Sequence, residues 1–238
     1  MDRPYIICHM VTSVDGKVTG SFLSGPEAEQ ACQVYYEYNR NYRADAFACG
    51  RVTMEGSFTQ GWTPDLSPFR DAPVEEGDYV ADKEANYFAV AFDRRGRLGW
   101  KQSRISDEDP GYDNAHVIEV LCRDTPRERL AYFRSVGVSY IFAGETELDL
   151  PLALKKLKTL FGIEKLLLEG GSVINGAFQR AGLIDELSLV VAPVAAQGQD
   201  KPLFDASCFQ GYQLQEVQRH EQSVLWLNYR KNDLNHGE

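Results

Sequence analysis

Residues 165–178 read Lys165-Leu-Leu-Leu-Glu169-Gly170-Gly171-Ser172-Val-Ile-Asn-Gly-Ala-Phe178. The apolar run that ends at Glu169 is typical of a fully buried parallel strand, and an amphipathic helix is expected to begin near Ser172. The glycines let a ligand approach the backbone, while the free N–H groups and the dipole of the helix favour an anion. The stretch therefore predicts a phosphate-binding turn, and a tight turn required only by sterics is the alternative.

Expected strands and helices alternate along the rest of the chain. The expected strands cover 5–11, 44–49, 87–92, 117–122, 138–142, 165–169 and 186–192, and helices are expected at 24–42, 151–161 and 172–181. Two capping boxes, Ser24-Gly-Pro-Glu27 and Thr125-Pro-Arg-Glu128, are expected to begin helices. Segments 212–218 and 224–230 alternate like an antiparallel hairpin. This order predicts an α/β fold with a mostly parallel central sheet, helices on both faces and a C-terminal antiparallel hairpin.

One domain over residues 1–238 is expected, interrupted by a long loop or insertion at about 59–84 that is rich in proline, glycine and acidic residues. This loop carries the aromatic residues Trp62, Phe69 and Tyr79. Aromatic side chains in a long loop usually pin it to the body of the protein, and lining a separate pocket is the alternative.

Composition excludes several classes of partner. The net charge of −10 and the isoelectric point near 5.0 disfavour nucleic acid and an anionic membrane surface as partners. Five widely spaced cysteines indicate neither a disulfide framework nor a zinc site, so no metal is expected. No run reaches membrane-spanning length and no basic leader precedes a long apolar stretch, so a cytoplasmic location is expected.

The ligand is not expected to be held by the usual dinucleotide fingerprint, because the first strand ends in Thr12-Ser-Val-Asp-Gly-Lys17 and lacks Gly-x-Gly-x-x-Gly. Three other places favour phosphate. They are the strand-to-helix junctions Gly50-Arg-Val-Thr53 and Glu169-Gly-Gly-Ser172, and a basic turn that contains Arg94, Arg95 and Arg97.

The joint order of these motifs resembles the reductase domain of the riboflavin-biosynthesis pyrimidine deaminase/reductase, a member of the dihydrofolate reductase superfamily. The resemblance extends over nearly the whole chain and rests on Ser13–Lys17, Phe92–Leu98, Glu169–Gly171, Gly182–Leu187 and Ala192–Pro193. It implies a dihydrofolate-reductase-like fold, the cofactor NADPH and reduction of a pyrimidine-type substrate. Gly50-Arg-Val-Thr-Met-Glu55 is closer to the corresponding motif of dihydrofolate reductase itself.

The resemblance also assigns cofactor-binding residues. They are Val11, Arg51, Thr53, Arg94, Gly170, Gly171, Ser172, Val173, Ile174 and Asn175. Related sequences often place a serine beside the adenosine 2′-phosphate at the position of Arg94, and a guanidinium suits a phosphate dianion. An exposed turn arginine is the alternative for Arg94.

For the substrate, the resemblance implies that Glu169 contacts the ring, with Arg43 or Arg40 on the substrate phosphate. Asp15 and Lys17 are the catalytic candidates, and an ordinary Asp-Gly turn is the alternative. Two family segments that contact substrate and cofactor are absent, one of them of the Asp-Asp-Pro type, so the substrate stays open.

Dihydrofolate or pterin reduction and a non-catalytic NADPH-binding sensor are the alternative functions. A homodimer is expected, because the family commonly pairs and the apolar Leu187–Val191 stretch and the C-terminal hairpin could form a shared surface.

Overall fold

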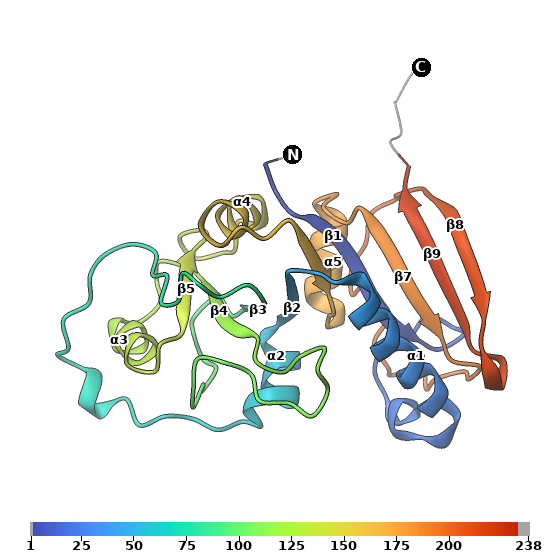
Figure 1. Cartoon of the computed structure of the whole chain (residues 1–238), viewed down its shortest axis with the longest axis horizontal. Coiled ribbons are helices and arrows are strands. Elements are labelled where there is room, and N and C mark those ends of the chain that lie inside the picture. Colours follow the sequence, from blue (N-terminus) through green and yellow to red (C-terminus); the bar gives the residue numbers. More distant parts are fainter. Residues whose placement is uncertain (1, 233–238) are drawn as a thin grey trace, which may run out of the picture. The chain divides into compact units, whose positions relative to one another are not determined.

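The computed structural model describes residues 2–232, and the chain forms two compact units (Figure 1). Unit 1 comprises Met1–Pro4 and Ala44–Leu166, and unit 2 comprises Tyr5–Arg43 and Leu167–Glu238. The strands follow the sheet order β5 (Ser139–Phe142), β4 (His116–Leu121), β3 (Phe88–Phe92), β2 (Ala46–Gly50), β6 (Lys165–Leu168), β1 (Tyr5–Thr12), β7 (Glu186–Val191), β9 (Leu225–Lys231) and β8 (Tyr212–Arg219). The prediction of one domain over residues 1–238 stays a prediction.

Unit 1 is built on a parallel sheet. Its strands are β2 (Ala46–Gly50), β3 (Phe88–Phe92), β4 (His116–Leu121) and β5 (Ser139–Phe142), paired in that order. Every residue of β3, β4 and β5 is buried, which explains why these strands are mostly apolar and do not alternate with exposed polar residues. The helices are α2 (Arg51–Met54), α3 (Arg127–Ser135) and α4 (Leu150–Phe161).

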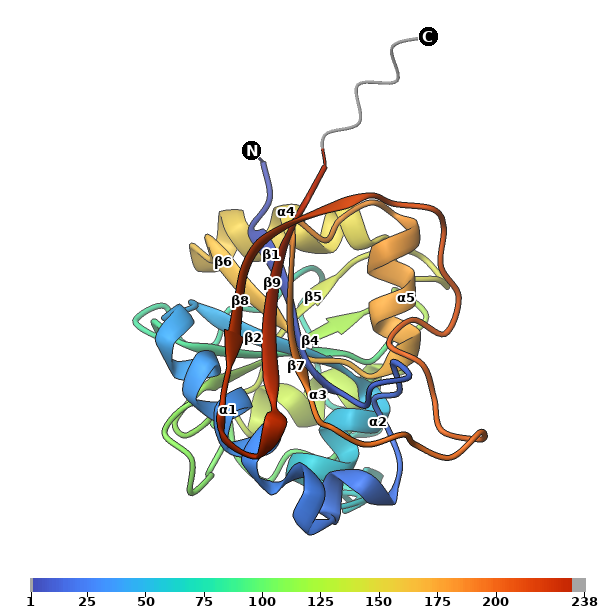
Figure 2. The same ribbon diagram turned by 90° about the vertical axis from the view of Figure 1, so that its right-hand side faces the viewer.

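Unit 2 combines parallel and antiparallel pairing. Strand β1 (Tyr5–Thr12) pairs in parallel with β7 (Glu186–Val191), and β9 (Leu225–Lys231) lies antiparallel between β7 and β8 (Tyr212–Arg219) (Figure 2). The helices are α1 (Pro26–Tyr42) and α5 (Ser172–Arg180). Strand β6 (Lys165–Leu168) begins in unit 1 and ends in unit 2. The predicted α/β class, with a mostly parallel sheet and a C-terminal antiparallel hairpin, is confirmed.

Both predicted capping boxes are wrong. Ser24 ends a 3₁₀ turn, Ser21–Ser24, so that Gly25 is the N-cap of α1 and no side chain caps the helix. Pro26 and the acidic residues of the first turn suit this start instead. Thr125 is one residue too early, because Pro126 is the N-cap of α3. The Thr125 hydroxyl donates to the Cys122 carbonyl at 2.7 Å.

The expected long loop is present between β2 and β3, and side chains fix it to unit 1. Phe69 packs edge-on against Tyr132, with ring centroids 5.8 Å apart. Tyr79 forms an isolated antiparallel bridge with Tyr140, in which its N–H donates to the Tyr140 carbonyl at 2.8 Å. Asp78 accepts from the Phe142 N–H at 2.8 Å. The pinning interpretation is therefore confirmed for Phe69 and Tyr79.

Candidate functional site

The carboxyl ends of the unit 1 strands bring two sequence motifs together. Gly50 is in register with Phe92, and Phe92 with Val120, so Arg51 and Asp93 both emerge directly beyond a neighbouring strand end. In open α/β sheets this edge is where ligands bind. The first turn of α2 and the basic turn after β3 thus face the same region.

The turn after β3 is held by Asp93, whose side chain is buried. Its carboxylate accepts from the Leu98 N–H at 2.8 Å, and its carbonyl accepts from the Gly96 N–H at 2.9 Å. Gly96 has a φ of 60°, and a Cβ there would lie 2.8 Å from the Phe133 ring, so the turn requires glycine. Burial raises the pKa of Asp93, while the surrounding N–H donors and the charge of Arg51 oppose that rise.

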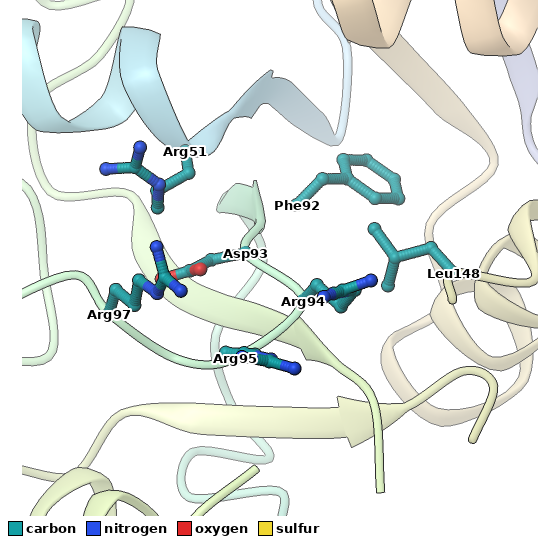
Figure 3. A pocket seen from close by; sticks show the side chains of 7 residues that line it. All are labelled: Arg51, Phe92, Asp93, Arg94, Arg95, Arg97 and Leu148. Carbon is teal, nitrogen blue, oxygen red and sulfur yellow. The ribbon is translucent and has the colours of Figure 1, made fainter. Parts of the chain in front are cut away.

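This turn lines a pocket of about 250 Å³ in unit 1 (Figure 3). The lining residues are Arg51, Phe92, Asp93, Arg94, Arg95, Arg97 and Leu148. Two of the predicted cofactor residues, Arg51 and Arg94, are therefore brought together, whereas Thr53 does not line this pocket. Four guanidinium groups line this one pocket, together with the Asp93 carboxylate, and on a chain with a net charge of −10 such an arrangement suits an anion.

In unit 2, the junction between β6 and α5 has the geometry of an anion-binding turn. Gly170 has a φ of 91°, a conformation that favours glycine, whereas Gly171 is extended. The first bond within α5 runs from the Asn175 N–H to the Gly171 carbonyl at 3.1 Å, so the N–H groups of residues 172–174 precede the helical ladder. Val173 is 59% exposed at this end, and the Ser172 hydroxyl donates to the Pro202 carbonyl at 2.5 Å.

Asn175 is fully buried behind this turn. Within the described residues, neither Oδ1 nor Nδ2 of its side chain has a hydrogen-bond partner. A buried carboxamide without partners is costly unless a ligand, a water molecule or a small rearrangement satisfies it. The Asn175 amide nitrogen also lies 3.7 Å from the position that a Cβ on Gly170 would take, which places it directly against the glycine turn.

The loop after β1 holds the two predicted catalytic residues. The Asp15 carboxylate accepts from the Ser13 hydroxyl at 2.7 Å and from the Ala196 N–H at 2.9 Å. The Ser13 hydroxyl, followed by the Ala196 N–H, lowers the pKa of Asp15. The Lys17 N–H donates to the Ser13 hydroxyl oxygen at 2.9 Å, so one serine fixes both ends of the turn. Val11 lies just before this loop and is buried in β1.

The family of the chain follows from comparison with known proteins. Residues 4–225 match the family model described as the RibD C-terminal domain. The chain belongs to this family. The predicted resemblance to the riboflavin-biosynthesis reductase domain is confirmed.

Curated relatives of this RibD C-terminal domain protein carry reductase names. The 2,5-diamino-6-ribosylamino-4(3H)-pyrimidinone 5′-phosphate reductase of Methanothermobacter thermautotrophicus is 29% identical over 199 residues, which are 83% of this chain and 82% of the relative. The reductase of the same name from Aquifex aeolicus is 26% identical over 209 residues, covering 85% of this chain and 82% of the relative.

Solved structures share the fold. A pyrimidine reductase-like protein from Corynebacterium diphtheriae superposes with a TM-score of 0.68 at 20% identity, covering 96% of this chain and 92% of the other. The riboflavin biosynthesis reductase of Saccharomyces cerevisiae superposes with a TM-score of 0.64 at 14% identity, covering 98% of this chain and 91% of the other. Among residues 2–232, none of the helices combines the length and the hydropathy that a membrane-spanning helix requires.

Sequence reasoning about this RibD C-terminal domain protein missed Asn39. The Asn39 Nδ2 donates to Glu169 Oε1 at 2.7 Å, and both side chains are buried, with Asn39 at 4% and Glu169 at 7% exposure. Arg40 and Arg43, the predicted phosphate ligands on α1, are exposed, and Arg43 ends the helix with a φ of 47°. A signal for Asn39 existed, because it continues the buried stripe of α1 that includes Ala31 and Val34.

Proposed function

We propose that this protein is an NADPH-dependent reductase of a pyrimidine ribosylamino 5′-phosphate. The observation that carries the proposal is the arginine pocket at the carboxyl edge of the parallel sheet, in a chain of the RibD C-terminal domain family. In the reaction, the C1′=N carbon of the ring-opened substrate gains a hydride and the nitrogen gains a proton, so that the ribosylamino group becomes ribitylamino. NADPH supplies the hydride when it is bound.

The residues present fit this cofactor within each unit. In unit 1 the arginine pocket would hold the adenosine 2′-phosphate, since charge-assisted bonds from guanidinium groups suit a phosphate dianion. In unit 2 the first N–H groups of α5, next to Gly171, would hold the pyrophosphate. The unpartnered amide of Asn175 behind that turn supports a ligand-binding role for the junction.

The substrate would be read by Glu169, which Asn39 fixes in position. A carboxylate accepts from ring N–H and amino groups, whereas Arg40 or Arg43 would provide charge for the substrate phosphate. For proton delivery, Lys17 suits the role better than Asp15. An aspartate is already ionised at neutral pH, and the two donors that hold the Asp15 carboxylate lower its pKa further.

The test combines cofactor titration with turnover. We expect NADPH to bind roughly tenfold more tightly than NADH, because charge-assisted hydrogen bonds to the 2′-phosphate contribute about 1.5–3 kcal/mol. NADPH oxidation should then be followed with the 2,5-diaminopyrimidinone and the 5-aminouracil ribosylamino phosphates and with dihydrofolate. Oxidation with dihydrofolate alone would favour a pterin reductase. Tight NADPH binding without oxidation by any substrate would favour a sensor.

We further propose that two copies of the chain pair through the sheet of unit 2. Strand register places Leu187 and Leu214 beside Tyr229, and Leu189 and Val217 beside Leu227, so that these side chains share one face. A β-bulge between Leu214 and Glu216 is what brings Leu214 and Val217 to the same face. At the β8 edge this face is open, with Leu214 at 47% and Val217 at 53% exposure.

A further inference from the structure

The arginines of the unit 1 pocket differ in whether they already form ion pairs with carboxylates of the protein. Arg51 pairs with Glu55 one helical turn on, at 2.6 Å, and Arg94 pairs with Glu147. Arg95 lies 3.4 Å from Asp124. Such half-exposed pairs are weak, yet each carboxylate brings a negative charge next to its guanidinium and repels an incoming phosphate.

Arg97 is different. Among the residues that the structure describes, its guanidinium has no hydrogen bond and no ion pair, so its five N–H donors are available. Arg97 also lines a second pocket of about 460 Å³ and therefore lies between the two pockets. In Figure 3 its guanidinium lies on the same side of the pocket as that of Arg51, whereas Arg94 points toward Leu148.

The backbone that carries Arg97 is fixed even though its side chain is exposed. On one side Gly96 is buried against Phe133, and on the other the Leu98 N–H donates to the buried Asp93 carboxylate at 2.8 Å. A fixed Cα limits where the guanidinium can reach, so that only the side chain, and not the turn, has to be ordered when an anion arrives.

We infer that Arg97 is the residue that selects NADPH over NADH, by donating to the adenosine 2′-phosphate with Arg51 beside it. This inference rests on the proposed function. It assigns lesser roles to Arg94 and Arg95, because their carboxylate partners compete with the phosphate. The planar fork of an arginine matches phosphate oxygens in pairs, and lysine offers only a point charge.

The test measures dissociation constants for NADPH and NADH by fluorescence titration of the wild type, R97Q, R94Q and R95Q. We expect R97Q to weaken NADPH binding roughly tenfold or more and to leave NADH binding unchanged within about twofold. R94Q and R95Q should weaken NADPH binding less than about threefold, and R97K should fall between wild type and R97Q. Because the Arg97 side chain is exposed and its guanidinium forms no hydrogen bond or ion pair with the described residues, the thermal midpoint of R97Q should equal that of the wild type.

The outcomes separate the two proposals. If the wild type binds NADPH and NADH equally, or binds neither, the proposed cofactor is wrong. If the wild type prefers NADPH and R97Q keeps the same preference, only the role of Arg97 is wrong. A larger loss in R94Q than in R97Q would likewise overturn the inference and return the 2′-phosphate to Arg94.

Discussion

Glu169 lies buried at the end of β6, where an uncompensated carboxylate would be costly. The Asn39 amide supplies a hydrogen bond at 2.7 Å. The charge of Glu169 also acts on a neighbouring group. Burial and the Glu169 carboxylate both raise the pKa of the Cys8 thiol. A carboxylate kept in such surroundings is typical of a ligand contact, which is the role proposed for it.

Glu169→Gln separates this role from cofactor binding. The amide oxygen of the variant can still accept from Asn39, but its NH2 would meet substrate donors, and such a mismatch costs about 1–3 kcal/mol. Turnover efficiency on the true substrate should fall roughly ten- to hundredfold, while the dissociation constant for NADPH barely changes. Glu164→Gln, which removes an exposed carboxylate that pairs with Lys158, is the matched control for loss of charge. A large loss of NADPH binding with normal substrate kinetics would place Glu169 on the cofactor side.

For single residues, the sequence predicted which side chains line the pocket better than it predicted their hydrogen-bond and ion-pair partners. Arg51 and Arg94 were predicted to bind phosphate, and they do line one cationic pocket. The carboxylates that occupy them come from Glu55 and Glu147, and the second of these lies 53 residues beyond its arginine. No local pattern reveals such a pairing. Asn39 was missed for a different reason. A single asparagine on the apolar stripe of a helix is easily taken for a polar residue without a function.

Among the elements, strands were predicted to within about two residues, because buried runs have clear ends at glycine, proline and charge. Helix starts were predicted less accurately. Ser24 and Thr125 match the capping pattern, but the backbone makes a separate turn at each, and the actual N-caps are Gly25 and Pro126. A capping box fixes only the spacing of side chains, whereas the preceding turn decides which residue is first to be helical.

Strand β1 carries a fully buried histidine. His9 Nε2 lies 2.9 Å from the Tyr35 carbonyl and therefore donates to it, so Nδ1 accepts from the Ser188 hydroxyl at 2.9 Å. The Ser188 oxygen in turn accepts from the Trp226 indole N–H at 2.8 Å. This chain of donors suits the neutral ring, and burial lowers the pKa of His9 to about 4.

The stability of the folded chain should therefore decrease as the pH is lowered, because of this histidine. The unfolded chain binds the proton near pH 6.5 and the folded chain only near pH 4, so the loss begins below about pH 6.5 and is complete near pH 4. At pH 5 it should amount to roughly 2 kcal/mol relative to pH 8. Urea unfolding of wild type and His9→Gln at both pH values measures it, with the wild type losing more. Equal losses in the two proteins would show that His9 does not titrate in this range.

At the scale of the whole molecule, the apolar face of β7, β9 and β8 offers a test of pairing. Val217→Lys places a charge at the exposed part of that face, so we expect the dimer to dissociate to monomers in light scattering after size exclusion. Gln213→Lys is the control, because Gln213 lies opposite Arg230 and points to the other face of the same strand. A dimer that survives Val217→Lys would remove this face from the interface. A monomeric wild type would end the dimer proposal itself.

The long segment of unit 1 is anchored near its end, by Asp78 to Phe142 and Lys156 and by Tyr79 to Tyr140. Between Gln60 and Gly77 the regular structure is one short 3₁₀ turn, Ser67–Phe69. Loop-closure entropy grows only slowly with length, by about 0.6 kcal/mol for each doubling. Within this interval Phe69 packs against Tyr132, and the Val74 carbonyl accepts from Arg127. Insertions and deletions should therefore have been cheap in evolution only between these contacts, while residues 78–81 keep a fixed distance from β5. Homologous chains should accordingly differ in length between Gln60 and Gly77 and align again without gaps at the Tyr79 bridge.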